Sequence, residues 1–153
     1  MSIKLNESIA EVILLKYVEI NGRKFYVDNK RVVIDPSKKE LYMALWLSKK
    51  LGKRIEILPR VLIPERIKTS DYLIDGSNWD LKTISSNRNN AIYTSIRIRQ
   101  EQSNNFIFDI SNSKLTIKAV LKQMDGIYSM KGFNWVNDVI IKKNNTLEII
   151  RRK

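Results

Sequence analysis

Cysteine and histidine are both absent from this sequence of 153 residues, and each absence excludes a kind of chemistry. Without cysteine there is no disulfide, no thiolate nucleophile and no cysteine zinc site. Without histidine, the usual general base and the usual zinc ligand are missing. Any catalysis by this chain must therefore use carboxylates, lysine or a bound metal ion.

Long apolar segments are missing as well. The longest one near the N-terminus, Ile9 to Leu15, is interrupted by Glu11, whereas a membrane-spanning helix needs about 20 apolar residues. The segment also lacks the cleavage site of a signal peptide. We therefore predict no signal peptide and no membrane segment in this chain.

The remaining composition is that of an ordinary globular protein, with 43% hydrophobic and 29% charged residues. A chain of this length is long enough for one compact domain and too short for two ordinary ones. We expect a single compact domain overall, in which residues 1–35 form an N-terminal β meander packed on a core made of residues 36–153.

The net charge of +12 predicts a polyanionic partner, such as nucleic acid, an anionic membrane or an acidic protein. Residues 71–110 hold four basic and five acidic residues, whereas residues 36–70 and 111–153 each hold nine basic and three acidic ones. Basic flanks around a local group of carboxylates suit a protein that binds phosphates and a metal ion together. The alternative is an ordinary basic surface in contact with water.

The expected elements begin with short strands between residues 13 and 34, joined by turns of which Asn21-Gly22 is the strongest signal. A helix is predicted over residues 38–51, because Ser37 can cap its start and Gly52 can end it in a left-handed conformation. Its apolar face is expected at the residues with helical spacing, which are Leu41, Ala44, Leu45 and Leu51. The N-terminal third of the chain is therefore expected to contain short strands followed by one well-defined helix.

Further strands and helices alternate after residue 53. The segment 90–102 suits a helix, although its isoleucines also suit a strand. This order predicts an α/β (α+β) fold with a mixed β-sheet flanked by helices. The expected strands cover residues 54–58, 72–74, 79–83, 106–110, 136–141 and 147–150, and the expected helices cover residues 90–102 and 115–127.

Asp71, Asp80 and Lys82 are the residues that point to chemistry. Asp80 and Lys82 alternate on one predicted strand, so their side chains share a face, and a short antiparallel pairing can bring Asp71 close to them. Two carboxylates and one ammonium suit phosphodiester cleavage, because the carboxylates hold a divalent metal and the lysine orients water or stabilises charge. Oxygen ligands favour Mg²⁺ or Mn²⁺, with Zn²⁺ a poorer fit. The alternative is a surface salt bridge.

Asp71 followed by Asp80-Leu81-Lys82 resembles the motif of the PD-(D/E)xK nuclease superfamily, with Ser70 where the name of the motif has proline. The resemblance implies a restriction-endonuclease-like αβββαβ core. It also implies that Asp71, Asp80 and Glu40 are metal ligands and form the catalytic site together with Lys82. Glu40 has a second interpretation, because Ser37-x-x-Glu40 is also a helix capping box.

A narrower resemblance covers residues 26–152. Four sequence segments resemble the C-terminal toxin domain of CdiA-type contact-dependent growth inhibition proteins, namely residues 32–35, 69–76, 79–82 and 105–111. This resemblance implies a tRNA-cleaving nuclease that is delivered as the C-terminal part of a larger protein, acts in the cytoplasm and is neutralised by an immunity protein. The basic charge predicts that this immunity partner is acidic.

Other polar residues are candidates for secondary roles. Asp75 stands in an Asp-Gly turn, which favours turn chemistry over catalysis, and Glu56 is a weaker acidic candidate. A second group offers donors for phosphate, with a water-exposed helix surface as the alternative. This nucleic-acid-binding group comprises Arg97, Arg99 and Gln100 after the triplet, and Lys114, Lys118 and Lys122 at four-residue spacing.

Three functions remain compatible with these patterns. The first is an RNase toxin that cleaves tRNA, and the second is a DNA endonuclease on the same scaffold. The third is a noncatalytic nucleic-acid-binding module in which the carboxylates and the lysine form salt bridges. Cleavage of RNA and of plasmid DNA, with and without a chelator, distinguishes among them.

Overall fold

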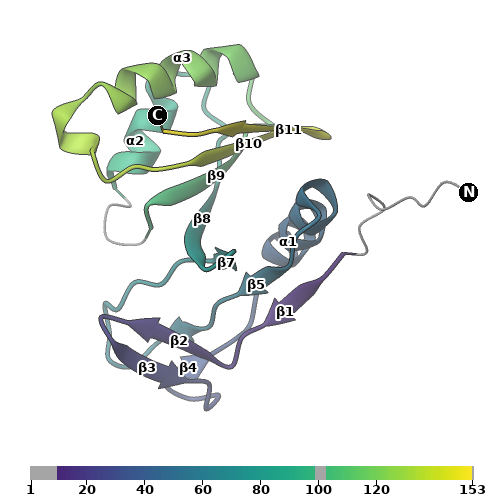
Figure 1. Cartoon of the computed structure of the whole chain (residues 1–153), viewed down its shortest axis with the longest axis vertical. Coiled ribbons are helices and arrows are strands. Elements are labelled where there is room, and N and C mark those ends of the chain that lie inside the picture. The colour runs from purple at the N-terminus through teal and green to yellow at the C-terminus, as the bar shows by residue number, and fades with distance from the viewer. Residues whose placement is uncertain (1–9, 99–102, 153) are drawn as a thin grey trace, which may run out of the picture. The chain divides into compact units, whose positions relative to one another are not determined.

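The computed structural model describes residues 10–98 and 103–152 (Figure 1). The chain comprises two compact units, Met1–Asn78 and Trp79–Lys153. In both units helices pack against a mixed β-sheet, which confirms the predicted fold class. The predicted division at residue 35 of a single domain is not tested by this boundary and stays a prediction.

The first unit contains a three-stranded part of the sheet in the order β1-β5-β7, where β1 runs parallel to β5 and β7 runs antiparallel to it. β2 and β3 form the hairpin predicted at Asn21-Gly22, and both turn residues have positive φ angles. β4 pairs with β6, so the N-terminal strands join separate sheets instead of one continuous meander. The strands are β1 (Val12–Leu14), β2 (Tyr17–Ile20), β3 (Arg23–Tyr26), β4 (Val32–Val33), β5 (Ile55–Ile57), β6 (Arg60–Val61) and β7 (Tyr72–Ile74).

Helix α1 (Lys38–Leu51) has the predicted bounds. Ser37 caps its start, and Gly52 ends it with a φ of 66° in the left-handed region. The apolar face differs from the prediction, because Leu41 and Leu45 are exposed. Both this stripe and the buried one satisfy helical spacing, and only packing on β1 and β5 selects between them. The buried hydrophobic residues are Met43, Ala44, Trp46 and Leu47.

The second unit contains the strand order β8-β9-β10-β11, in which β8, β9 and β10 are parallel and β11 closes an antiparallel hairpin. Helices α2 and α3 cover one face of these strands (Figure 1). The elements are β8 (Ser77–Thr83), α2 (Ala91–Arg97), β9 (Asn105–Asp109), α3 (Ile117–Tyr128), the 3-10 helix η1 (Lys131–Phe133), β10 (Val139–Lys143) and β11 (Thr146–Ile150).

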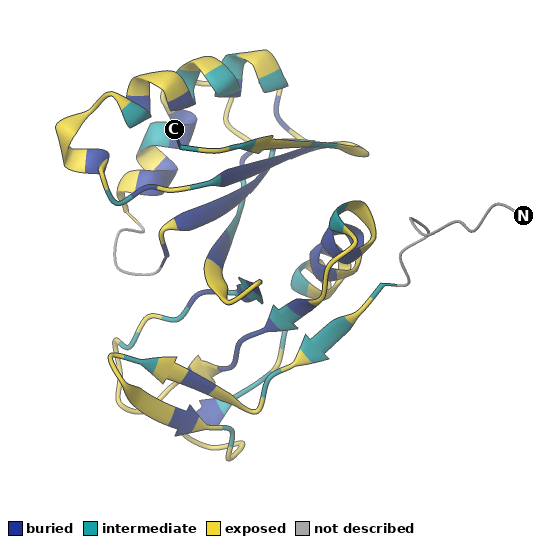
Figure 2. Cartoon of the chain, in the orientation of Figure 1, coloured by how far each residue is buried: buried dark blue, intermediate teal, exposed yellow. Residues whose placement is uncertain are grey.

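The core of the second unit lies between these helices and the strands. β9 is buried along almost its whole length (Figure 2), and the rings of Phe106 and Phe108 are fully buried, with centroids 5.9 Å apart. Truncating such a ring to alanine typically costs about 3–5 kcal/mol. Strand β9 therefore fixes the neighbouring strand β8 in place.

The segment 90–102, which suited either a helix or a strand, forms helix α2 over residues 91–97. Ile92 and Ile96 are fully buried at helical spacing, whereas Ile98 is 59% exposed just beyond the end of the helix. Residues 99–102 lie outside the described residues. Within the parts of the chain that the structure describes, no helix is long and apolar enough to cross a bilayer.

Candidate active site

Asp80 and Lys82 lie two residues apart on β8, so both side chains project from the same face of the sheet. In the parallel register they lie beside Phe106 and Phe108, whose rings belong to the core under α2 and α3. Leu81 projects from the opposite face. The shared face of Asp80 and Lys82 is therefore the one that the helices cover.

Asp80 is only 4% exposed, which is unusual for a carboxylate. Moving an ionised carboxylate out of water costs several kcal/mol unless a cation or hydrogen-bond donors compensate it. Lys82 is partly buried on the same face. A buried carboxylate with a cation two residues away is characteristic of sites where chemistry or ion binding takes place.

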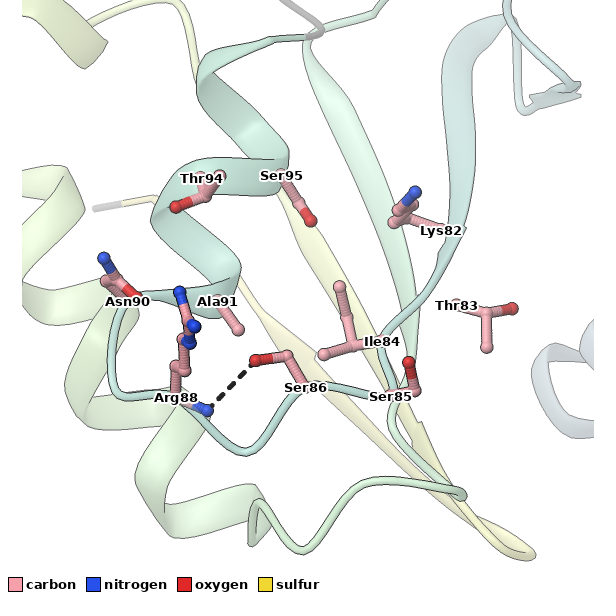
Figure 3. Close-up of a pocket in the computed structure, with 10 residues that line it drawn as sticks. All are labelled: Lys82, Thr83, Ile84, Ser85, Ser86, Arg88, Asn90, Ala91, Thr94 and Ser95. Carbon is pink, nitrogen blue, oxygen red and sulfur yellow. Dashed lines mark hydrogen bonds between the residues drawn. The ribbon is translucent and has the colours of Figure 1, made fainter.

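Lys82 lines a pocket of about 530 Å³ that lies wholly within the second unit. Lys82 stands on β8 at one side, and Arg88 extends from the loop before α2 at the other (Figure 3). None of the described residues that line the pocket is acidic. These residues are Lys82, Thr83, Ile84, Ser85, Ser86, Arg88, Asn90, Ala91, Thr94 and Ser95.

The loop that forms one wall of the pocket is held by hydrogen bonds at several points. The Ser113 hydroxyl donates to the backbone oxygen of Ser86 at 2.7 Å, and the Lys114 amide donates to Asn87 Oδ1 at 2.7 Å. Near the start of α2, the Ile92 amide donates to Gln123 Oε1 at 3.1 Å. The wall is therefore fixed both to the segment after β9 and to α3.

Glu40 and Asp71 belong to the first unit, where both act on the phenol of Tyr72. Tyr72 is fully buried, and its hydroxyl donates to the backbone oxygen of Glu40 at 2.7 Å. Burial raises the pKa of Tyr72, and the negative charges of Asp71 and Glu40 raise it further. The backbone oxygen of Asp71 accepts from the Leu58 amide at 3.0 Å, which fixes Asp71 directly before β7.

The capping role predicted for Glu40 is confirmed. Glu40 Oε1 accepts from the Ser37 amide at 3.2 Å and from the Ser37 hydroxyl at 3.0 Å, while the Glu40 amide donates to Ser37 Oγ at 3.1 Å. Asp75 lies in the β7–β8 turn with a φ of 52°, as its turn sequence predicted, and its carboxylate forms an ion pair with Lys53. Glu56 lies on β5 opposite Leu73. A metal-binding role of Glu40 stays a prediction.

The residues that the structure describes contain no group of three or more acidic side chains that could hold a metal ion. Metal binding by Asp71 and Asp80 stays a prediction. The donor chemistry still fits a hard cation, because the chain offers carboxylate oxygens and has neither histidine nor cysteine. Mg²⁺ in proteins is commonly held by one or two carboxylates and keeps several waters.

The predicted nucleic-acid-binding residues fall into different settings. Lys114, Lys118 and Lys122 are exposed; Lys118 and Lys122 lie one turn apart on α3, and Lys114 precedes the helix. Lys122 lines a hollow of about 330 Å³ together with Asn89, Ala119 and Gln123. The Arg97 guanidinium lies 5.8 Å from the ring centroid of Tyr93. Arg99 and Gln100 lie outside the described residues.

Sequence reasoning missed most of the pocket. Arg88 and the neighbouring hydroxyl and amide groups were not predicted as pocket residues. A polar loop has no periodic sequence pattern from which pocket-lining residues can be recognised. One signal was available, namely that an uninterrupted polar run directly follows the strand carrying Asp80 and Lys82. That run is Ser85-Ser86-Asn87-Arg88-Asn89-Asn90.

Comparisons with known proteins point to one family. The family described as "Contact-dependent growth inhibition CdiA C-terminal domain" matches residues 68–147, slightly more than half of the 153 residues, and this range includes β8 and the pocket. A chain of the solved "CdiA-CT/CdiI toxin and immunity complex from Burkholderia pseudomallei" is similar at 22% identity and a TM-score of 0.59, over 80% of this chain and 96% of that chain. At this identity the likeness shows the fold. The search of curated proteins found no match.

Proposed function

This chain belongs to the family of contact-dependent growth inhibition CdiA C-terminal domains, and on that premise we propose that it is a toxin domain that cleaves nucleic acid. The observation that carries the proposal is the face of β8, where the buried carboxylate of Asp80 lies two residues from Lys82. Lys82 lines a pocket whose described lining residues include no acidic one. A polyanion is the substrate that suits this pocket and the net charge of +12.

We assign the site residues the roles that the PD-(D/E)xK resemblance implies. Asp71 and Asp80 would hold Mg²⁺ or Mn²⁺, with Glu40 as a third candidate ligand. When bound, such an ion lowers the pKa of a coordinated water and neutralises phosphate charge. Lys82 donates hydrogen bonds to the phosphate oxygens and stabilises the negative charge that develops on them.

The proposed substrate is RNA, with tRNA favoured over DNA, and the site of action is the cytoplasm of a target cell. Support comes from the resemblance to tRNA-cleaving toxin domains and from the family match. The domain would be delivered as the C-terminal part of a larger protein. An acidic immunity protein is the expected partner, since the similar structure is described as a toxin and immunity complex and this chain is strongly basic.

A cleavage assay tests this proposal. Purified chain is incubated with total RNA or plasmid DNA, with Mg²⁺ or Mn²⁺ and with EDTA, and we expect tRNA cleavage that EDTA stops. Lys82→Ala should lower the cleavage rate by about 10²–10³-fold. Lys131→Ala changes an exposed lysine of η1 outside the pocket and should cleave as wild type does. Full activity in EDTA would overturn the metal assignment.

The same assay separates the competing functions. Nicking of plasmid DNA while tRNA stays intact would make the chain a DNA endonuclease. Salt-sensitive binding without cleavage under any divalent metal would make it a noncatalytic binding module.

A further inference from the structure

We propose that the pocket beside Lys82 binds the backbone phosphate next to the one that is cleaved, with Arg88 as the main donor. This inference rests on the proposed nuclease function and adds to it a binding residue that neither the triplet nor the resemblance supplies. The pocket lies within residues 82–95 of the second unit. Its assignment therefore depends only on groups whose mutual positions the second unit fixes.

The chemistry of the pocket is selective for an anion. Arg88 contributes a guanidinium, Lys82 an ammonium, and Ser85, Ser86 and Thr94 hydroxyl groups, and no described lining residue is acidic. A guanidinium matches a phosphate in bidentate geometry, and hydroxyl groups add donors without adding charge. The pocket thus offers several donors to a phosphate and no group that repels it.

The Arg88 side chain is available for a ligand. Its backbone amide donates to Ser86 Oγ at 3.2 Å and its backbone oxygen accepts from the Ala91 amide at 3.2 Å. Its guanidinium forms no hydrogen bond or ion pair with any described residue. The backbone is therefore anchored while the charged group remains free to bind a phosphate.

The loop that carries Arg88 is pre-organised. Hydrogen bonds from Ser113, and from the Lys114 amide to Asn87, tie it to the segment after β9. A donor on a fixed wall loses less conformational entropy on binding than a donor on a free loop. Arg88 also differs from the exposed lysines of α3 in that it lines this pocket and they do not.

The dimensions and lining indicate which part of the substrate enters. A volume of about 530 Å³ exceeds what one phosphate needs and lies in the range of pockets that hold small organic ligands. Ile84 and Ala91 are buried and give the pocket an apolar floor, and none of the described lining residues is aromatic. A sugar can rest on this floor, but the described lining offers no ring for base stacking. The pocket should hold the sugar-phosphate backbone with little base preference.

The position of Lys82 explains why the bound phosphate is a neighbour of the cleaved one. Lys82 and Arg88 line the same pocket, so a strand whose scissile phosphate reaches Lys82 also passes Arg88. Binding at Arg88 holds the strand while Lys82 acts on the reacting phosphate. Holding a substrate in register in this way raises the rate of a reaction by orienting its groups.

Binding and cleavage by the full chain test the assignment. Fluorescent RNA hexamers of each single base are titrated with wild type, Arg88→Ala and Arg151→Ala in EDTA at several salt concentrations. Arg151 is a matched control, because its side chain is 70% exposed and its ion pair with Asp138 is long, at 3.9 Å. We expect Arg88→Ala to bind about tenfold more weakly, with a salt slope reduced by about 0.7. Arg151→Ala should bind as wild type does, and all four hexamers should behave alike.

The kinetic arm uses tRNA and Mg²⁺. Arg88→Ala should raise KM about tenfold with a smaller change in kcat, and Arg88→Lys should recover part of the loss because it keeps the charge without the bidentate fork. Equal binding by Arg88→Ala and Arg151→Ala would overturn the inference, and so would a strong preference for one hexamer. If wild type cleaves nothing, the nuclease proposal fails, while a binding loss confined to Arg88→Ala would still support the phosphate pocket.

Discussion

Two regions of the second unit use their cations in opposite ways. Near the C-terminus, Arg152 binds groups of the protein itself: Nε donates to the Val136 oxygen at 2.5 Å, Nη2 donates to the Phe133 oxygen at 2.7 Å, and the guanidinium lies 4.5 Å from the ring centroid of Tyr128. At the pocket, the Arg88 guanidinium contacts no described acceptor. Arg152 therefore stabilises the fold, whereas the Arg88 guanidinium is available to a ligand.

The lysines repeat this contrast. Lys143 Nζ donates to the backbone oxygens of Ser113 at 2.6 Å and Leu115 at 2.8 Å, whereas Lys82 lines the pocket. A net charge of +12 therefore overstates the surface that is available to a polyanion, because part of it serves backbone carbonyls. What distinguishes a cation that stabilises the fold from one that lines the pocket is the set of hydrogen-bond acceptors around it.

Lys82→Ala should produce the largest effect, a fall in the cleavage rate of about 10²–10³-fold, as expected when a donor that stabilises transition-state charge is removed. Its free energy of unfolding should stay close to that of wild type, since Lys82 lies at the edge of a pocket. Rates with tRNA and a urea denaturation curve measure both quantities. Unchanged cleavage would remove Lys82 from the site.

Arg152→Ala should show the opposite pattern. It leaves several backbone oxygens without their charged donor, so we expect the free energy of unfolding to fall by about 2–3 kcal/mol. Cleavage per folded molecule should change less than twofold at a temperature well below the midpoint. Arg151→Ala is the control and should stay within about 0.5 kcal/mol of wild type. A large loss of activity in folded Arg152→Ala would break the contrast between the two arginines.

In the first unit, Ser37→Ala and Glu40→Gln separate the two roles assigned to the Glu40 carboxylate. These are helix capping and the proposed metal binding. Ser37→Ala removes the cap and should cost about 1 kcal/mol without changing cleavage. Glu40→Gln preserves the capping box, because glutamine can also reach the cap amide. If Glu40 is also a metal ligand, Glu40→Gln should raise the Mg²⁺ concentration that gives half-maximal cleavage. An unchanged Mg²⁺ dependence would leave Glu40 with capping alone.

Tyr128, which contacts Arg152, provides the prediction with the smallest expected effect. Burial, followed by the charge of Asp138, raises its pKa to about 12, while Arg152 opposes the shift. Because the folded pKa lies above the unfolded value of about 10, the folded state holds the proton more tightly. This stability is fully present below pH 10 and is lost as the pH rises toward 12. A phenolate absorbance titration of wild type and Tyr128→Phe should reveal a step near pH 12 that the variant lacks.

Local sequence signals predicted a large part of the fold and the strand face that carries Asp80 and Lys82. Asn21-Gly22 specified its hairpin, because both positions require positive φ angles that these residues adopt readily. Alternation along a strand was enough to put Asp80 and Lys82 on one face. Such features depend on backbone dihedral preferences and on the alternation of side chains along a strand, and both can be recognised within a few residues of sequence.

The sequence by itself determined the capped helix α1, the tight turns, the shared face of Asp80 and Lys82, and the chemistry available to a chain without cysteine or histidine. Tertiary structure alone decided that β1 pairs with β5 beyond the intervening helix, that a polar loop forms a wall beside Lys82, and which cations face a pocket. The reason is physical: local preferences act on neighbouring residues, whereas pairing partners and acceptors are selected by burying the whole apolar surface at once.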